Sequence, residues 1–164
     1  MKNLNYLIFS IFFCVVTSFL VLTILVTPAY ALNYNNRTLL EVDFSNQDLT
    51  DSSFDHANLR GSNFSNSNLQ GVRLFSANLA GVNFEGANLA YADLESARMT
   101  RTNFTNAVLE GAFVTNGKFD GAIINGADFT DVILRPTIQA MLCEIATGTN
   151  PTTGRKTRET LFCD

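Results

Sequence analysis

A five-residue pattern, repeated without a break over most of the chain, limits the possible fold more than any other feature. It occurs nineteen times between Val42 and Pro136. Each unit has a small residue, a polar residue, a large apolar residue and two residues suited to a turn. A match in every one of nineteen consecutive units excludes chance and marks a repeat architecture. The large position is filled by Phe44, Leu49, Phe54, Leu59, Phe64, Leu69, Leu74, Leu79, Phe84, Leu89, Leu94, Met99, Phe104, Leu109, Val114, Phe119, Ile124, Phe129 and Leu134.

A period of five matches neither the 3.6-residue period of a helix nor the two-residue period of a strand. A chain satisfies it by alternating a short extended piece with a corner, so that it coils around an axis. The large residue of each unit and the small residue two positions earlier then point inward, and only Gln47 is bulky at the small position. Seven glycines lie two residues after the large one, where a corner needs backbone freedom: Gly61, Gly71, Gly81, Gly86, Gly111, Gly121 and Gly126.

A second period, of twenty residues, is superimposed on the first. Four units would then make one turn, and like residues would stack along the axis. Nineteen units correspond to almost five turns, and a spacing of ~4.8 Å between turns gives a rod ~23 Å long. The residues that recur at this period include Phe44, Phe64, Phe84 and Phe104.

This run of units resembles the pentapeptide-repeat proteins, whose consensus is A-(D/N)-L-x-x. The resemblance covers more than half of the chain. It implies an all-β solenoid, a right-handed quadrilateral β-helix of about five coils over residues 42–136. It implies little about activity, because this family carries many different functions on one scaffold.

The first 31 residues have a different composition from the rest. Lys2 is their only charged residue, residues 6–26 are nearly all apolar, and residues 29–31 read Ala-Tyr-Ala. These features predict a secretory signal peptide that is cleaved after Ala31. Because the apolar run is long enough to span a bilayer, an uncleaved membrane anchor is the alternative. Residues 32–41 are predicted to form an imperfect N-terminal cap, since Arg37 occupies a small position there.

The repeat register stops at Pro136, and residues 137–164 are predicted to form a helical C-terminal cap. Thr137 is expected to cap a helix that runs to about Ala146. The apolar stripe of this helix would cover the end of the last coil. A loop follows at residues 148–154, and Thr157 is predicted to begin a short helical turn. The stripe consists of Ile138, Met141, Leu142 and Ile145.

Cys143 and Cys163 are the two cysteines that follow the predicted leader. Two cysteines in an exported protein favour one disulfide. A redox-active pair is the alternative, although the C-x-x-C spacing typical of such pairs is missing. The sequence of residues 143–163 resembles the C-terminal region of thylakoid-lumen pentapeptide-repeat proteins of cyanobacteria and chloroplasts. That resemblance implies an exported protein of the thylakoid lumen or periplasm.

The sequence predicts no catalytic, cofactor-binding or metal-binding residues. His56 is the only histidine, and no second metal ligand of the usual kind lies near it in the sequence. The carboxylates are spread along outward positions, whereas paired catalytic carboxylates need a pocket that shifts the pKa of one of them. Fifteen acidic residues against eleven basic ones argue against a nucleic-acid partner.

Two classes of function remain. The first is a structural or protein-interaction scaffold in an oxidising compartment. The second, implied by the family, is a DNA-mimicking inhibitor or protector of a topoisomerase. Export and a disulfide oppose the second, because that partner is cytosolic. A redox-responsive role of Cys143 and Cys163 is a more distant third. The acidic outward positions are also interrupted by basic residues at Arg60, Arg73, Arg98, Arg101 and Lys118.

Several outward positions that should be polar are instead large and apolar. Phe113 and Ile133 are expected on one face, one turn apart, with Phe75 on that face two turns before Phe113. Exposed rings on a soluble rod indicate a contact surface, for an unknown protein or a second copy. For Ile133 the favoured interpretation is different: Leu161 and Phe162 of the tail would fold over it. The apolar outward positions of the C-terminal half are Val108, Phe113, Ile123 and Ile133.

Overall fold

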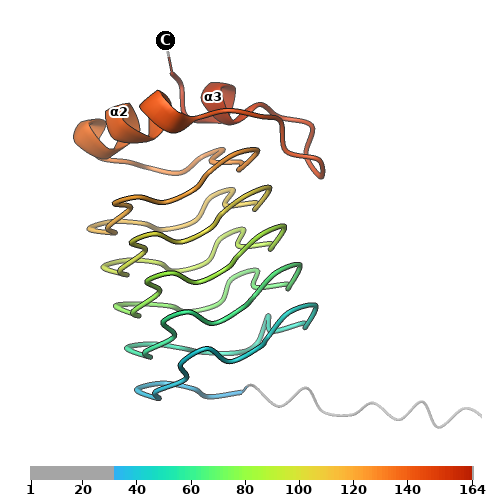
Figure 1. Cartoon of the computed structure of the whole chain (residues 1–164), viewed down its shortest axis with the longest axis vertical. Coiled ribbons are helices and arrows are strands. Elements are labelled where there is room, and N and C mark those ends of the chain that lie inside the picture. Colours follow the sequence, from blue (N-terminus) through green and yellow to red (C-terminus); the bar gives the residue numbers. More distant parts are fainter. Residues whose placement is uncertain (1–31, 164) are drawn as a thin grey trace, which may run out of the picture. The chain divides into compact units, whose positions relative to one another are not determined.

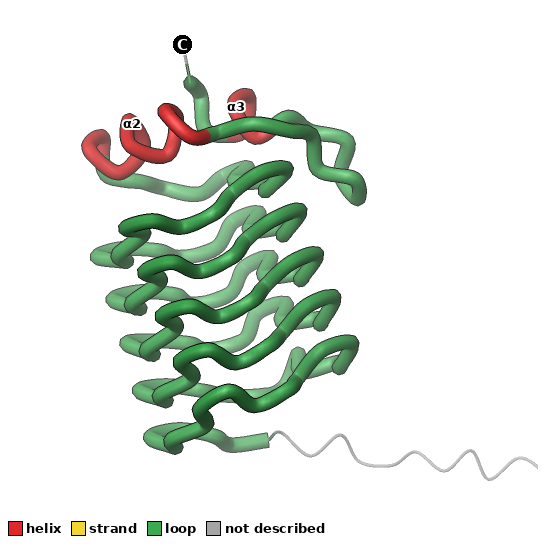
Figure 2. Tube along the Cα trace, in the orientation of Figure 1, coloured by secondary structure: helices red, strands yellow, loops and turns green. Residues whose placement is uncertain are grey.

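The computed structural model describes residues 32–163, which belong to one compact unit. The predicted signal peptide, residues 1–31, lies outside the described residues. Figures 1 and 2 show a stack of coils closed at its C-terminal end by two short helices. Each coil is one turn of twenty residues, and the first begins at Asn33.

The coils are joined by parallel β-bridges between residues twenty positions apart. The series runs from Asn33↔Ser53 to Val108↔Asp128, which confirms four five-residue units per turn. Phe84 N–H donates to the Asn103 carbonyl at 2.7 Å, and Asn103 N–H donates to the Val82 carbonyl at 2.9 Å. Each bridge is isolated, so the described residues contain no continuous strand, and Figure 2 draws the coils as loop.

The corner of each unit is its fifth residue, two positions after the large one. From Asn36 to Asp131 every described corner residue has a positive φ except Asp51. Glycine adopts this conformation without strain, and asparagine tolerates it better than most residues do. The corner positions predicted from the glycines are confirmed. Bulky residues such as Tyr91 and Arg101 also occupy corners, with φ of 59° and 58°.

The interior is filled by columns of like side chains. The rings of Phe44 and Phe64 stack with their centroids 4.8 Å apart, and those of Phe64 and Phe84 follow at 5.3 Å. Leu89, in a neighbouring column, is completely buried. The inward assignment of the large position is confirmed. Gln47 keeps the register of the small position but is exposed, because it lies in the first coil, which has no further coil beneath it among the described residues.

Two helices make up the C-terminal cap: α2, Pro136–Ile145, and α3, Thr157–Thr160. Arg135, not Thr137, is the N-cap residue of α2, because Pro136 occupies the first helical position, where its fixed φ is favourable. The predicted burial of Ile145 is also wrong, since this side chain is 46 % exposed. The helix ends there, and the extended Ala146 turns into the core instead.

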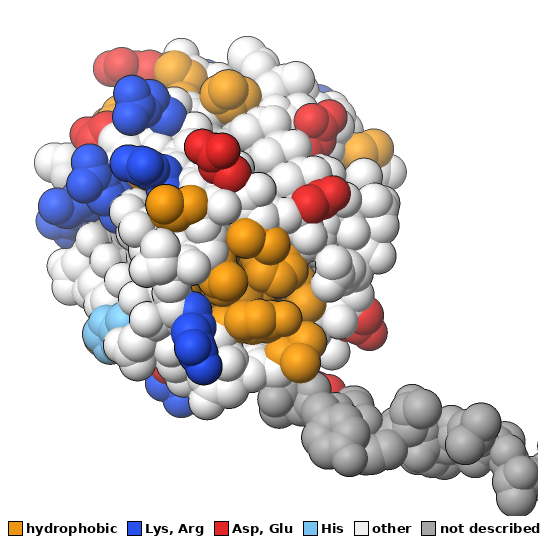
Figure 3. Space-filling model, turned by 60° about the horizontal axis from the view of Figure 1, so that its bottom comes forward, with side chains coloured by type: hydrophobic (Ala, Val, Ile, Leu, Met, Phe, Trp, Pro, Cys, Tyr) orange, Lys and Arg blue, Asp and Glu red, His pale blue; other side chains and the backbone are white. Residues whose placement is uncertain are grey.

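The two ends of the stack differ. At the C-terminal end, Leu142 of α2 and Leu161 of the tail are buried and close the core. At the N-terminal end, Leu32 and Leu40 are 45 % and 42 % exposed, and Figure 3 shows an apolar patch on that end. Within residues 32–163 no helix has the length and apolar character needed to cross a membrane.

Replacement of Leu89 by alanine should lower the free energy of unfolding by about 2–5 kcal/mol, because the close-packed column leaves a cavity that its neighbours cannot fill. Urea unfolding followed by circular dichroism measures this change. The exposed Glu85, on an adjoining face, provides the control, and Glu85→Ala should be nearly neutral. Equal stability of the two variants would contradict the packing described above.

Candidate interaction surface

The twenty-residue turn gives the stack four faces, each built from one unit per coil. The first face contains residues 42–46 and their equivalents at steps of twenty. The second, third and fourth faces begin in the same way at 47–51, 52–56 and 57–61, and the fourth also includes 37–41. A side chain on one face meets the side chains twenty residues before and after it.

The predicted pair Phe113 and Ile133 lies on the third face, one turn apart. The bridge Asp93↔Phe113 fixes the register of this column. Phe113 is 58 % exposed and Ile133 is 88 % exposed. The expectation that the tail covers Ile133 is therefore wrong. Leu161 turns into the core instead and leaves Phe162, 77 % exposed, pointing outward.

Phe75 lies on the same face but is not part of this exposed pair. It is half-buried, and its ring meets the ring of His56 edge to face, with centroids 5.5 Å apart. Its N–H donates to Oδ1 of the buried Asp55 at 3.2 Å, and Asp55 also pairs with Arg73. Phe75 is therefore held within a local cluster, which the intervening coil separates from Phe113. No group of residues suited to a metal ion occurs around His56 or elsewhere in residues 32–163.

The other apolar outward residues do not join the pair. Ile123 is 53 % exposed on the first face, and Val108 is half-buried on the second. A crevice of about 300 Å³ opens beside Ile133, between the coil at Val114 and the chain entering α2 at Pro136. This crevice exists because the chain leaves the stack at Arg135 instead of completing another coil. Phe113, Ile133 and the crevice form the apolar site of the third face.

Asn150 fastens the loop between α2 and α3 to the side of the stack, a role that the sequence did not reveal. Its side chain is completely buried. The Nδ2 group donates to the carbonyl oxygens of Asn106, Ala107 and Gly126 at 2.9–3.1 Å. Oδ1 accepts hydrogen bonds from the N–H groups of Thr152 and Thr153. One side chain thus joins two coils to the cap.

Arg155 of the same loop crosses to the second face and pairs with two of its acidic residues. One guanidinium nitrogen lies 2.8 Å from Glu110 Oε2, and the other lies 3.3 Å from Asp128 Oδ2. Asp128 is an outward residue by register, yet its side chain is completely buried beneath the loop. Asp128 therefore has a structural role beneath the loop.

Several contacts keep Asp128 ionised. Burial by itself would raise the pKa of this carboxyl. The hydroxyl groups of Thr130 and Thr153 lower the pKa by donating hydrogen bonds, as does the backbone N–H of Thr130, and the charge of Arg155 adds to this. The lowering contributions prevail, and the pKa of Asp128 falls below 3.8.

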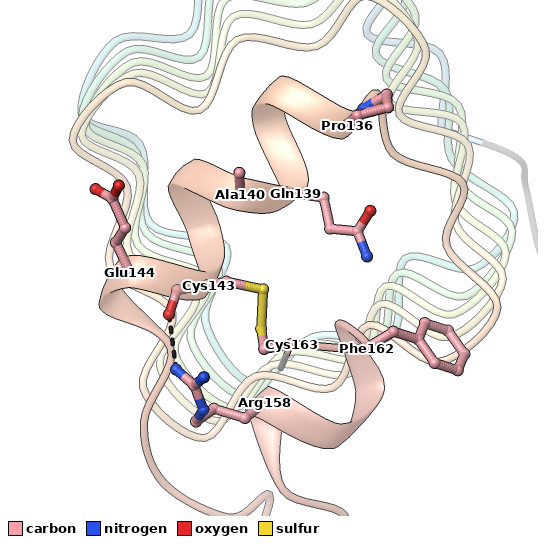
Figure 4. A pocket seen from close by; sticks show the side chains of 8 residues that line it. All are labelled: Pro136, Gln139, Ala140, Cys143, Glu144, Arg158, Phe162 and Cys163. Atoms are coloured by element: carbon pink, nitrogen blue, oxygen red, sulfur yellow. Dashed lines mark hydrogen bonds between the residues drawn. A yellow bond between two sulfur atoms is a disulfide. The ribbon is translucent and has the colours of Figure 1, made fainter.

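Cys143 of α2 and Cys163 of the tail form a disulfide, with Cα atoms 5.6 Å apart. The bond closes a segment of twenty residues and ties α2 to the end of the chain. Figure 4 shows it lining an open depression of about 580 Å³. Arg158 Nη1 donates to the Cys143 carbonyl at 2.9 Å across one side of this depression. Both cysteines are half-buried.

Two family profiles match the repeats. One, described as a pentapeptide repeat region, matches residues 32–114. The other, described as pentapeptide repeats in eight copies, matches residues 97–135. The chain belongs to the pentapeptide-repeat family. No curated protein matches this pentapeptide-repeat chain.

Solved structures of other pentapeptide-repeat proteins are similar to the chain. A protein of the Arabidopsis thaliana thylakoid lumen is 39 % identical over 80 % of this chain and 91 % of its own, with a TM-score of 0.68. A protein of Nostoc PCC 7120 is 28 % identical over 56 % of this chain and 84 % of its own, with a TM-score of 0.47. The similarity to the Arabidopsis protein implies a right-handed β-helix.

Replacement of Asn150 by alanine in this pentapeptide-repeat protein should lower the free energy of unfolding by about 2 kcal/mol or more, because buried carbonyl groups lose their donor. Chemical unfolding measures the effect. Thr152→Ala, at an exposed position in the same loop, should change stability little. A harmless Asn150→Ala substitution would show that the loop is not fastened by this side chain.

The stabilising contribution of Asp128 should depend on pH. A lowered pKa in the folded state means that this contribution is fully present above the unfolded value of 3.8. It is lost as the pH falls through the folded pKa. The difference in unfolding free energy between the wild type and Asp128→Asn should therefore be constant near neutral pH and shrink below pH 3.8. A difference that grew on acidification would contradict the assigned direction of the pKa shift.

Proposed function

We propose that this pentapeptide-repeat protein is a non-enzymatic scaffold that is exported to the thylakoid lumen or periplasm and binds a protein through the apolar site of the third face. The observation that carries this proposal is the exposure of Phe113 and Ile133 on successive coils, 58 % and 88 %. Large exposed apolar side chains on successive coils are typical of contact surfaces. The adjacent crevice at Val114 and Pro136 offers space for an apolar side chain of the partner.

The chemistry of the described residues supports a scaffold over an enzyme. Asp128 is a completely buried carboxylate, but its pKa is lowered and Arg155 pairs with it, so it is suited to structure and not to proton transfer. His56 is exposed at a corner and contacts Phe75. General acid–base catalysis instead needs a titratable group within reach of a bound substrate.

Export is supported by three independent features. The leader has the composition of a signal peptide, the tail contains a disulfide, and a thylakoid-lumen protein is 39 % identical. Disulfides persist in compartments outside the reducing cytosol. The half-buried disulfide joins α2 to the tail, and this cross-link accounts for it without a redox function.

A DNA-mimicking role is less well supported. Such a role requires an acidic surface along the rod, whereas the fourth face carries Arg60, Arg98 and Lys118, all exposed. The solved structure of a plasmid-mediated fluoroquinolone resistance protein is only 17 % identical, with a TM-score of 0.28. That degree of similarity gives no support to a shared function.

The double variant Phe113→Ser with Ile133→Ser tests the proposed interface. It should abolish association. Cross-linking in the exporting cell measures binding to another protein, and sedimentation measures self-association. The melting temperature should change little, because both side chains are exposed. Tyr91→Ser removes a ring that is 53 % exposed at a corner of the second face and serves as the control.

Two results would count against this interface. Association that survives the double substitution would remove the apolar site from the contact. A marked fall in melting temperature would show that Phe113 and Ile133 contribute to the core and not to an interface.

A further inference from the structure

The fourth face collects half of the basic residues in the described chain. Five of the ten basic residues in 32–163 lie on it, although they are far apart in the sequence. All five are exposed, and none makes an ion pair within the described residues. Two acidic residues share the face, Glu41 at its first coil and Asp120 at its last. The five basic residues are Arg37, Arg60, Arg98, Arg101 and Lys118.

The opposite, second face has the reverse charge. It contains five acidic residues and no basic residue of its own, and Arg155 from the loop neutralises part of it. The acidic face points away from anything that touches the basic one. Figure 3 shows Lys and Arg side chains gathered at one side of the view.

The middle of the fourth face carries short side chains. Asn78 Nδ2 donates to Asn58 Oδ1 at 3.1 Å along its centre, and Arg98 and Lys118 continue the same column. Between the N-terminal and C-terminal basic residues lie the buried Ala80 and a corner glycine, Gly81. No bulky side chain therefore rises between them.

The apolar content of this face distinguishes between the possible partners. Leu40 is its only exposed large apolar side chain among the described residues, and no exposed aromatic ring lies on it. Protein interfaces usually depend on buried aromatic anchors at their centre. The fourth face lacks such anchors, but it has the basic residues that suit an anionic bilayer.

We propose that the fourth face is a peripheral membrane-binding surface that docks on anionic lipid headgroups. The five basic side chains contact headgroup phosphates, and the axis of the rod lies along the bilayer. Each basic residue near an anionic bilayer contributes roughly a fivefold increase in affinity, so binding is weak, reversible and sensitive to salt. The third face adjoins the fourth at a corner and remains accessible, so this surface is separate from the protein interface proposed above.

Vesicle co-sedimentation of residues 32–164 tests the proposal. The compact unit contains its own core, and omission of residues 1–31 removes an apolar run that is long enough to span a bilayer. The probes are vesicles of phosphatidylcholine alone and vesicles with about 30 mol % phosphatidylglycerol, at about 0.05 M and 0.5 M salt. We expect binding to the anionic vesicles at low salt, with loss at high salt and no binding to neutral vesicles.

Two matched pairs of variants distinguish an effect of this face on vesicle binding from an effect of net charge. Arg98→Glu with Lys118→Glu should reduce binding at least about tenfold. Arg135→Glu with Lys156→Glu changes the net charge equally at exposed positions off the fourth face and should retain most of the binding. Circular dichroism verifies the fold, and Arg98→Gln with Lys118→Gln replaces the Glu variant if that variant does not fold.

Three outcomes would overturn the proposal: no binding to anionic vesicles at low salt, equal loss in both pairs of variants, or binding to immobilised polyglutamate or duplex DNA but not to vesicles. Absence of binding excludes a membrane surface. Equal loss in both pairs shows that binding depends only on net charge. Binding to polyglutamate or DNA alone assigns the face to an acidic macromolecule. None of them bears on the Phe113–Ile133 interface.

Discussion

Hydrogen bonding between the backbones of successive coils is the constraint on which the rest of this structure depends. Asn63 N–H donates to the Val42 carbonyl, and Phe64 N–H donates to the Asn83 carbonyl. These bonds fix the spacing of the coils at ~4.8 Å, so every side chain lies directly above its equivalent one turn earlier. Inside, this register stacks aromatic rings. Outside, it builds ladders of amides in which Asn103 Nδ2 donates to Asn83 Oδ1 at 2.9 Å.

Two of these amide ladders end in the C-terminal half of the stack. An amide ladder satisfies its own donors and acceptors and presents no net charge to a partner. On the fourth face it gives way to Arg98 and Lys118, and on the first face Asn103 is followed by Ile123. The residues that replace the amides take no part in the ladder's side-chain hydrogen bonds. They are therefore available for contacts outside the chain.

Features that depend on the five-residue period could be predicted from the sequence, whereas contacts without a period could not. The core columns and the corners follow from register alone. Asn150 bonds to carbonyl groups 24 to 44 residues away, and no spacing rule connects those positions. Phe75 and Phe113 share a face, but only the structure shows the His56 ring beside Phe75. Only the structure shows that the space beside Gly117 is occupied, because a Cβ atom there would lie 2.5 Å from Met99 Cε.

The grouping of basic residues on one face is not evident from their order along the chain. Read along the chain, Arg60, Arg98 and Lys118 interrupt runs of acidic residues and suggest a mixed surface. Read at intervals of twenty, they fall on one face, because coiling converts sequence order into four independent columns. Folding requires only the inward positions and the corners. The outward positions of each face can therefore vary separately. The second face contacts the cap, the third carries an apolar pair, and the fourth carries the basic residues.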